Sequence, residues 1–326
     1  MNGIGTARVE VRRGAYLESV HTFSACIVRA DGEVIDAFGD VEHVYPVRSL
    51  AKPFLAAMLA SSGAAEAYEF DEADIALAAG SHDGEQRHVE AVRRILARLD
   101  LDENALLCGP AKEGRAVIGP PIANNCSGKH AAVLALCRHL GYSVERYVEP
   151  THPVQVRLLS TIMPAFGVSF GPHELAVDGC DMPIFGASLR QIAVAYARFG
   201  VAEDEASTRV RGAMTAQPAY VGGWQDNLDT QLIEWSHGAI IGKIGAEGLH
   251  ADAILTQGIA LAVKVHDGNS RALPSILAQL IPRCADPSPL AAETLANLAK
   301  RPVFNAVGRT IGGIALGAEL VTEELL

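Results

Sequence analysis

A serine and a lysine three positions apart are the first candidates for chemistry in this chain. They are Ser49 and Lys52, in the stretch VRSLAKPF, and residues at this spacing share one face of a helix. A serine attacks only after a base removes its proton, and a lysine that burial or nearby cations keep neutral can be that base. The alternative is an ordinary helix start, with Ser49 as the N-cap and Lys52 in solvent. The motif alone leaves both interpretations open.

Two further stretches place a serine and a lysine among glycines. Ser81 lies in AAGSHDGE, where its hydroxyl either faces the first pair or caps the next helix. Lys243 lies in GKIGAEG on an expected strand, where it either meets a ligand or is an exposed lysine at a strand edge. The chain has 21 arginines and only six lysines. Because lysine can lose its proton in a protein and arginine does not, lysines inside polar motifs favour a chemical role.

Two cysteine-containing stretches could supply soft metal ligands. NNCSGKH contains Cys126 and Lys129, and DGCDMP contains Asp178 and Cys180. Lys129 falls at the start of an expected helix, where the dipole disfavours a cation, so we expect its pKa to be lowered and its amine to be neutral. Two thiolates and a nitrogen suit zinc. The alternative for Cys126 is a small buried side chain without chemistry, and the sequence does not show that the two cysteines meet.

Strand-like and helical patterns follow one another in blocks along the chain. Residues 7–38 alternate apolar and polar, with Asp31–Gly32 as a hairpin turn. Apolar residues at three- and four-residue spacing predict helices over 50–63, 84–100, 129–141, 154–167, 186–200 and 204–216. Strands are expected again over 238–245 and 248–268, and closing helices over 272–282 and 290–300. Residues 109–125 form the longest loop-like stretch, and loops of that length are usually functional.

This order of elements predicts an α+β fold. We expect an antiparallel sheet built from both ends of the chain, flanked by the terminal helices, with a helical lobe inserted between them. The expected organisation is a single unit of residues 1–326. Within it, the sheet and its covering helices occupy 1–48 and 236–326, and the mainly helical lobe occupies 49–235.

The composition limits the classes of partner. The net charge is −11 and no lysine- or arginine-rich run is present, which argues against nucleic acid and anionic membranes and leaves a small polar substrate by elimination. The first residues lack a signal-peptide pattern, and no apolar run reaches the roughly 18 residues of a membrane span. Six cysteines without regular spacing do not indicate a disulfide framework. We therefore expect a cytoplasmic protein with reduced thiols.

Taken together, the motifs resemble a known family. RSLAKP, SHDGE, NNCSGKHA, HPVQ, DGC and GKIGAEG, in this order over roughly residues 10–320, resemble the rhizobial-type (class 3) L-asparaginases of the asparaginase II family. The resemblance implies a β-lactamase-like fold, similar to serine β-lactamases, penicillin-binding proteins and serine glutaminases. It also implies hydrolysis of L-asparagine to L-aspartate and ammonia. Members of the family tend to be dimers, so a homodimer is expected by analogy.

The resemblance also implies roles for individual residues. Two serine–lysine pairs are implied in catalysis: Ser49, Lys52, Ser81 and Lys243. A metal site, usually zinc, is implied for Cys126, Lys129 and Cys180, and no organic cofactor is expected. Contact with the substrate is expected of Arg48 and Asp178, whose charges could meet its α-carboxylate and α-ammonium groups, and of three residues in the same motifs, Asn125, His130 and Glu247.

The chain departs from the family pattern in two places, and other functions stay open. Asp181 stands where a small residue is expected, and the loop after Cys108 lacks an expected histidine; either change could alter substrate preference or the surroundings of the metal. The predicted mechanism has Ser49 attacking the amide carbon, Lys52 as its base and Ser81 with Lys243 relaying a proton to ammonia. The alternatives are a glutaminase or penicillin-binding-type serine amidohydrolase, and a non-catalytic zinc-binding protein of the same fold.

Overall fold

The computed structural model describes residues 8–113, 116–169, 175–255, 257–285 and 288–317. Its contacts divide the chain into two compact units. The sheet unit comprises residues 1–45, 188–201 and 235–326, and the helical unit comprises residues 46–187 and 202–234. Each unit is described by itself.

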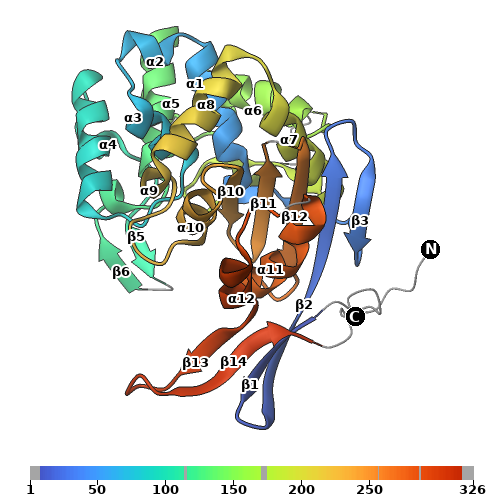
Figure 1. Cartoon of the computed structure of the whole chain (residues 1–326). Coiled ribbons are helices and arrows are strands. Elements are labelled where there is room, and N and C mark those ends of the chain that lie inside the picture. Colours follow the sequence, from blue (N-terminus) through green and yellow to red (C-terminus); the bar gives the residue numbers. More distant parts are fainter. Residues whose placement is uncertain (1–7, 114–115, 170–174, 256, 286–287, 318–326) are drawn as a thin grey trace. The chain divides into compact units, whose positions relative to one another are not determined.

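The sheet unit contains an antiparallel sheet drawn from both ends of the chain (Figure 1). Its strands are β1 (Arg8–Arg13), β2 (Tyr16–Arg29), β3 (Val34–Phe38), β10 (Ile240–Gly245), β11 (Leu249–Ile254), β12 (Ile259–Val265), β13 (Arg301–Phe304) and β14 (Thr310–Leu316). They run in the order β10-β11-β12-β2-β1-β14-β13, and β3 pairs with β2. Val9 of β1 pairs with Leu316 of β14, and Val263 of β12 pairs with Ala25 of β2. This confirms the predicted sheet of both chain ends and the hairpin at Asp31–Gly32.

Helices cover both faces of this sheet. They are α7 (Leu189–Val201), α11 (Leu273–Cys284), which follows the short η5 (Ser270–Ala272), and α12 (Ala292–Ala299). Gly200 of α7 packs against the side chain of Ala253 in β11. The thiol of Cys284 in α11 is close enough to Asp252 of β11 for the two to interact electrostatically. Asp252 and Ala253 are consecutive residues of β11, so their side chains point to opposite faces of the sheet, and α11 covers the face that α7 does not. Two covered faces explain why every residue of β11 and β12 is buried.

The helical unit holds most of the predicted site. Its helices are α1 (Lys52–Ser61), α2 (Ala64–Ala67), α3 (Glu72–Ala79), α4 (Gln86–Arg98), α5 (Ser127–Leu140), α6 (Pro153–Ala165), α8 (Glu205–Ala216), α9 (Pro218–Val221) and most of α10 (Leu228–Trp235). Short elements complete it: η1 (Arg48–Ala51), η2 (Glu103–Ala105), η3 (Pro121–Ala123), β5 (Ala111–Glu113), β6 (Ala116–Gly119), β7 (Ala176–Val177) and β8 (Pro183–Ile184). Strands β4 (Val44–Pro46) and β9 (Gly186–Ser188) lie at the unit boundaries.

Helices α1 and α3 form the centre of the helical unit, since each contacts α5 and α8. The sequence allows α5 to approach α3 closely because residue 128 is glycine: a Cβ there would lie 2.7 Å from the carbonyl oxygen of Leu77. Helix α5 ends, as predicted, at Gly141, which adopts a left-handed conformation with φ 70°. These contacts bring the start of α1, the end of α3 and the start of α5 together.

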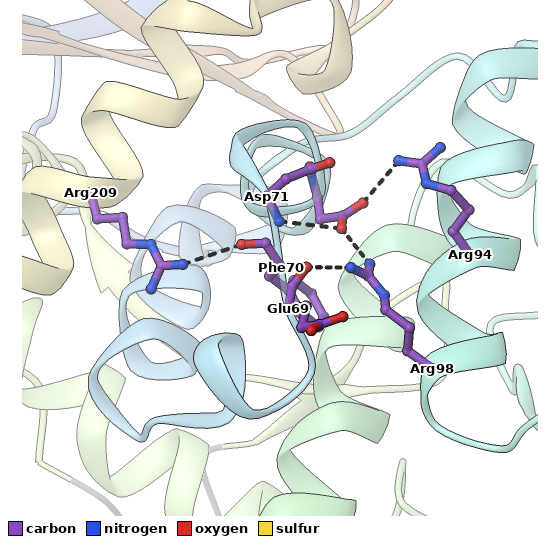
Figure 2. Close-up of polar contacts among 7 residues, drawn as sticks. Glu69, Phe70, Asp71, Arg94, Arg98 and Arg209 are labelled. Atoms are coloured by element: carbon purple, nitrogen blue, oxygen red, sulfur yellow. Dashed lines mark hydrogen bonds and ion pairs between the residues drawn. The ribbon is translucent and has the colours of Figure 1, made fainter.

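A cluster of charges fixes the start of α3 (Figure 2). Asp71 and Asp74 form a capping box at the first turn, and Asp74 is fully buried with ion pairs to Arg94 and Arg98 of α4. Arg98 also donates to the carbonyl oxygen of Glu69. Arg209 of α8 donates to the carbonyl oxygen of Phe70 at 3.2 Å (Figure 2). We name Asp71, Asp74, Arg94, Arg98 and Arg209 the α3 clamp.

The structure differs from the sequence-based expectations at three points. Residues 48–51 form a 3-10 turn, so α1 begins at Lys52 rather than near Ser49. The stretch 109–125 is not a plain loop, because it contains the β5–β6 hairpin and η3. The chain does not close on helices: β13 and β14 follow α12. No helix in the described ranges is long and apolar enough to cross a membrane.

Candidate active site

Lys52 lies at the convergence of three segments of the helical unit. Its side chain is only 2% exposed, and its Nζ donates to the carbonyl oxygen of Gly80 (2.7 Å), the hydroxyl of Ser81 (2.9 Å) and the carbonyl oxygen of Asn125 (3.1 Å). The alternative interpretation, a solvated lysine, is therefore wrong. A buried amine held by these acceptors is placed for proton transfer with a hydroxyl.

Ser49 is half-buried in η1, one turn before Lys52. No side chain caps η1 or α1, so the interpretation of Ser49 as an N-cap is wrong. Among the residues that the structure describes, the Ser49 hydroxyl has no hydrogen-bond partner, whereas the hydroxyl of Ser81 is held by Lys52. A hydroxyl without a partner is available to a substrate.

Ser81 lies on an extended segment between α3 and α4. The backbone N–H groups of Ser81 and Asp83 donate to the carbonyl oxygens of Val221 and Gly222, both at 2.8 Å. Gly80 permits this approach, because a Cβ at this position would lie 2.6 Å from the carbonyl oxygen of Val221. The sequence reads here as a turn between two helices, and pairing with residues 221–222 makes it a fixed strand-like segment.

The three predicted metal ligands meet in the interior of the helical unit. Cys126, Lys129 and Cys180 are 5%, 6% and 3% exposed. Lys129 Nζ lies 2.9 Å from Cys180 Sγ, and the two thiols share a hydrogen bond. That bond, and the positive charges of Lys52 and Lys129, hold the pKa of Cys126 well below its usual range despite burial, so one sulfur of the pair is a thiolate.

The electrostatic expectation for Lys129 is wrong. Burial disfavours its charge, but Cys126, Cys180 and Asp178 outweigh burial and raise its pKa above the ordinary value. The prediction considered only the helix dipole, which is weaker than a nearby thiolate. In the protein without metal, Lys129 is therefore the cation that balances the thiolate.

Two buried thiols and an amine suit a thiophilic ion in chemistry, although their spacing needs adjustment. Two ligands of one tetrahedral zinc ion lie about 3.5 Å apart, so Lys129 Nζ and Cys180 Sγ would have to separate slightly from their hydrogen bond. In the part of the chain that the structure describes, no group of three or more His, Cys, Asp or Glu side chains is arranged to hold a metal.

Arg48 and Asp178 pair with each other. Arg48 Nε lies 2.7 Å from Asp178 Oδ1, and the carboxylate is 7% exposed. Burial raises the pKa of Asp178, but Lys129 and Arg48 outweigh that effect and lower it. Arg48 adopts a positive φ of 49°, an uncommon conformation for a side chain of this size. The pair is therefore ionised, and a substrate that contacted either group would meet it already paired.

A cavity of about 50 Å³ adjoins this pair inside the helical unit. Its polar lining consists of Arg48, Lys52, Lys129, Gln155 and Asp178, and the rest is apolar, from residues 47–55, α6 and residues 182–185. Gln155 was not assigned a role from the sequence. The signal was present, since Gln155 is the last residue of the HPVQ motif. It is 1% exposed and donates from Nε2 to the carbonyl oxygen of Tyr147 at 2.8 Å.

The remaining predicted substrate contacts in the helical unit lie at different depths. The Asn125 side chain is exposed. His130 is fully buried, with Nδ1 2.6 Å from the Tyr147 hydroxyl. Burial and the charges of Lys129 and Lys52 hold the pKa of His130 well below its usual range, so it is neutral. Contact of either residue with a substrate stays a prediction.

Lys243 and Glu247 belong to the sheet unit. Lys243 is fully buried on β10, opposite Ala251 of β11, and donates to the carbonyl oxygen of Ile244 at 3.2 Å. The alternative interpretation, an exposed lysine at a strand edge, is therefore wrong. Glu247 is exposed in the turn between β10 and β11, with φ 64°. The pairing of Lys243 with Ser81 stays a prediction.

The two departures from the family pattern have local explanations. Asp181 is exposed and has φ 70°, a conformation that favours glycine but that aspartate adopts more readily than most residues. After Cys108, the carbonyl oxygens of residues 108, 109 and 110 all accept hydrogen bonds from Asn124 Nδ2. The loop is therefore held from the NNCSGKH motif rather than by a histidine of its own.

The sequence matches one family model, L-asparaginase II, over residues 9–316. The chain therefore belongs to the L-asparaginase II family, which confirms the predicted resemblance and makes an amidohydrolase the class of protein that this site defines. No curated protein sequence matches the chain.

Similar solved structures include two β-lactamases and a protein named Mglu. A β-lactamase from Mycobacterium bovis is 15% identical, with a TM-score of 0.40 over 76% of this chain and 88% of its own. A putative β-lactamase from Bacteroides dorei is 12% identical, with a TM-score of 0.39 over 75% and 84%. Mglu is 14% identical, with a TM-score of 0.36 over 80% and 60%. At these TM-scores the likeness carries no further argument.

Proposed function

We propose that this chain is an L-asparaginase that hydrolyses L-asparagine to L-aspartate and ammonia, with Ser49 as the nucleophile and Lys52 as its base. The observation that carries the proposal is the buried Lys52 amine hydrogen-bonded to the Ser81 hydroxyl, in a chain of the L-asparaginase II family. The partner of this site is a small polar amide.

The acceptors of Lys52 support its role in proton transfer. The carbonyl oxygens of Gly80 and Asn125 can only accept, so a neutral amine gives them its two N–H bonds and keeps its lone pair available for a hydroxyl proton. After Lys52 takes the Ser49 proton, its third N–H can donate to Ser81 Oγ, which lies 2.9 Å from Nζ. Ser81 can then pass its own proton onward and receive the one from Lys52.

The proposed reaction has two stages. Ser49 Oγ attacks the side-chain amide carbon, and the tetrahedral intermediate collapses when the nitrogen receives a proton from Ser81, releasing ammonia and an aspartyl ester on Ser49. Water then attacks the ester and gives its proton to Lys52, which returns a proton to Ser49 Oγ as the ester bond breaks and L-aspartate leaves. Lys243 is proposed to assist Ser81 in the relay.

Substitution of each serine separates the nucleophile from the relay. Ser49→Ala should abolish ester formation and lower ammonia release from L-asparagine at least about 1,000-fold. Ser81→Ala should instead slow acylation by the amide, and with it ammonia release, while an aryl ester of L-aspartate, whose leaving group needs no proton, should still acylate Ser49, which intact-protein mass spectrometry detects as added mass. L-Glutamine assayed in parallel tests the glutaminase alternative. Full ammonia release by Ser49→Ala would rule out the assignment.

We further propose that Cys126, Cys180 and Lys129 hold a zinc ion beside the substrate. Their donor set supports the proposal, because both thiols are buried and one is already a thiolate. A bound zinc would supply a fixed positive charge that orders the pocket. Cys126→Ser should weaken zinc binding at least about 100-fold, measured by native mass spectrometry. The same spectrum tests the predicted homodimer, and zinc without amide turnover would favour a non-catalytic protein.

A further inference from the structure

The residue after Ser81 connects the two polar motifs of the helical unit. His82 is fully buried. Its Nδ1 accepts from the backbone N–H of Gly84 at 3.2 Å, so the ring proton lies on Nε2. Nε2 lies 3.1 Å from Ser127 Oγ, whose own hydroxyl donates to the carbonyl oxygen of Ile122 at 2.7 Å. The partners of His82 therefore fix both its tautomer and the direction of its hydrogen bonds.

This bond runs beside the bonds of Lys52. Ser127 is the first residue of α5 and directly follows Cys126, while His82 directly follows Ser81. Lys52 bridges the same two segments through Ser81 and the carbonyl oxygen of Asn125. The spacing between the segment of Ser81 and the start of α5 is thus set twice, once by the amine and once by the imidazole.

Packing leaves the imidazole little freedom. The His82 ring stacks on that of His88 at 4.8 Å with an interplanar angle of 26°. The turn that follows is also close-packed: a Cβ at Gly84, which has φ 70°, would overlap the carbonyl oxygen of Ala123. Because the His82 ring is held from three sides, it also restricts the position of Ser81, the residue before it.

We propose that His82 is a positioning residue. Its hydrogen bond to Ser127 holds the neighbouring Ser81 at hydrogen-bond distance from Lys52. This inference rests on the proposed function only in giving Ser81 the relay to the leaving nitrogen. Loss of the hydrogen bond between His82 and Ser127 moves Ser81 away from Lys52 and slows the step that needs a proton on the leaving group. A displacement near 1 Å at a reacting group costs about 100-fold in rate.

Two conservative variants separate the two hydrogen bonds of the ring. His82→Gln places an N–H donor where Nε2 was and can keep the bond to Ser127, whereas His82→Asn keeps a polar group only near Nδ1. We expect His82→Asn to lower kcat for L-asparagine about 10- to 100-fold with little change in KM, and His82→Gln to stay within about threefold of the parent. Ser127→Ala should reproduce the Asn variant with less disturbance of the fold.

The choice of substrate distinguishes positioning from general damage. An aryl ester of L-aspartate has a leaving group that needs no proton, so the same variants should hydrolyse it at nearly the parent rate. A matched control is His88→Phe, which keeps an aromatic ring against His82 and removes the hydrogen bond that His88 Nε2 donates to the carbonyl oxygen of Ala219. It should lower thermal stability and leave both rates unchanged.

A crystal structure of His82→Asn gives a reading that does not depend on turnover. The distance from Lys52 Nζ to Ser81 Oγ, now 2.9 Å, should lengthen beyond hydrogen-bonding range. An unchanged distance, or equal losses on the amide and the ester, would overturn the positioning role. A parent protein that releases no ammonia from L-asparagine would contradict the proposed function instead, while the distance would still decide the role of His82.

Discussion

The two ends of α3 both gather buried charge, but they neutralise it differently. At the start, the Asp74 carboxylate is paired with the guanidinium groups of Arg94 and Arg98, which are 49% and 26% exposed. Just beyond the end, Lys52 is held by two carbonyl oxygens and a hydroxyl. An ion pair fixes the charge of both partners, whereas an amine held by neutral acceptors can exchange a proton with a hydroxyl. The first arrangement stabilises the helix, and the second prepares a proton transfer.

The largest expected effect comes from removing the amine of Lys52, which lies just beyond the end of α3. Lys52→Met keeps the apolar stem of the side chain and removes its proton-accepting amine. We expect ammonia release to fall about 1,000-fold or more, since a positioned acid–base group contributes about 100- to 10,000-fold. The free energy of unfolding should fall by no more than about 1–3 kcal/mol, because only the hydrogen bonds of one amine are lost. A drop in stability with full activity would place Lys52 with the structural charges instead.

The opposite result is expected at the α3 clamp. Asp74→Asn leaves two arginines facing a neutral amide and weakens the capping box of Asp71. Breaking a buried ion pair costs about 3–5 kcal/mol, and because both arginines can turn toward water we expect about 2 kcal/mol in the free energy of unfolding. Denaturant titration measures this change. The kcat of the folded fraction should be unaltered, and Arg94→Ala, which removes the more exposed partner, is the milder control.

The smallest effect tests the buried histidine next to the site. Burial lowers the pKa of His88 below its usual value, although Ala219 and Glu85 oppose the shift. Near pH 6.5, His88 therefore binds a proton in the unfolded chain but stays neutral in the folded chain. Stability is full above about pH 6.5 and declines below it by at most about 1.4 kcal/mol per pH unit. Melting curves at pH 5.5 and 7.5 should differ less in His88→Gln than in the parent.

The sequence predicted elements well where one local rule decided the structure. Alternation around Asp31–Gly32 gave the β2–β3 hairpin, and Gly141 marked the end of α5. The final hairpin was missed because its strands contain Pro302, Gly312 and Gly313, which hide a strand pattern. Gly312 is needed there, since a Cβ would overlap the carbonyl oxygen of Arg12 on β1. The need for glycine at this position follows from the pairing of β14 with β1, which the sequence alone does not show.

The site was predicted in its residues but not in its pairings. Ser49 and Lys52 were selected by their spacing, yet the hydroxyl that Lys52 holds belongs to Ser81, 29 positions later. The pKa shift of Lys129 was predicted with the wrong sign, because the helix dipole was considered and the charges of Cys126, three positions away, and of Cys180, 51 positions away, were not. The pairing of Arg48 with Asp178 likewise spans 130 positions.

The pairing of β1 with β14 has a consequence for how the protein folds. Val9 and Leu316 are neighbours in the sheet although about 300 positions of chain separate them. Closing a loop of that length costs about 5 kcal/mol in chain entropy, and contacts between such distant segments slow folding. During synthesis, one edge of β1 stays unpaired until β14 has left the ribosome. An unpaired edge invites aggregation, so we expect refolding yield to depend on protein concentration more strongly than on temperature.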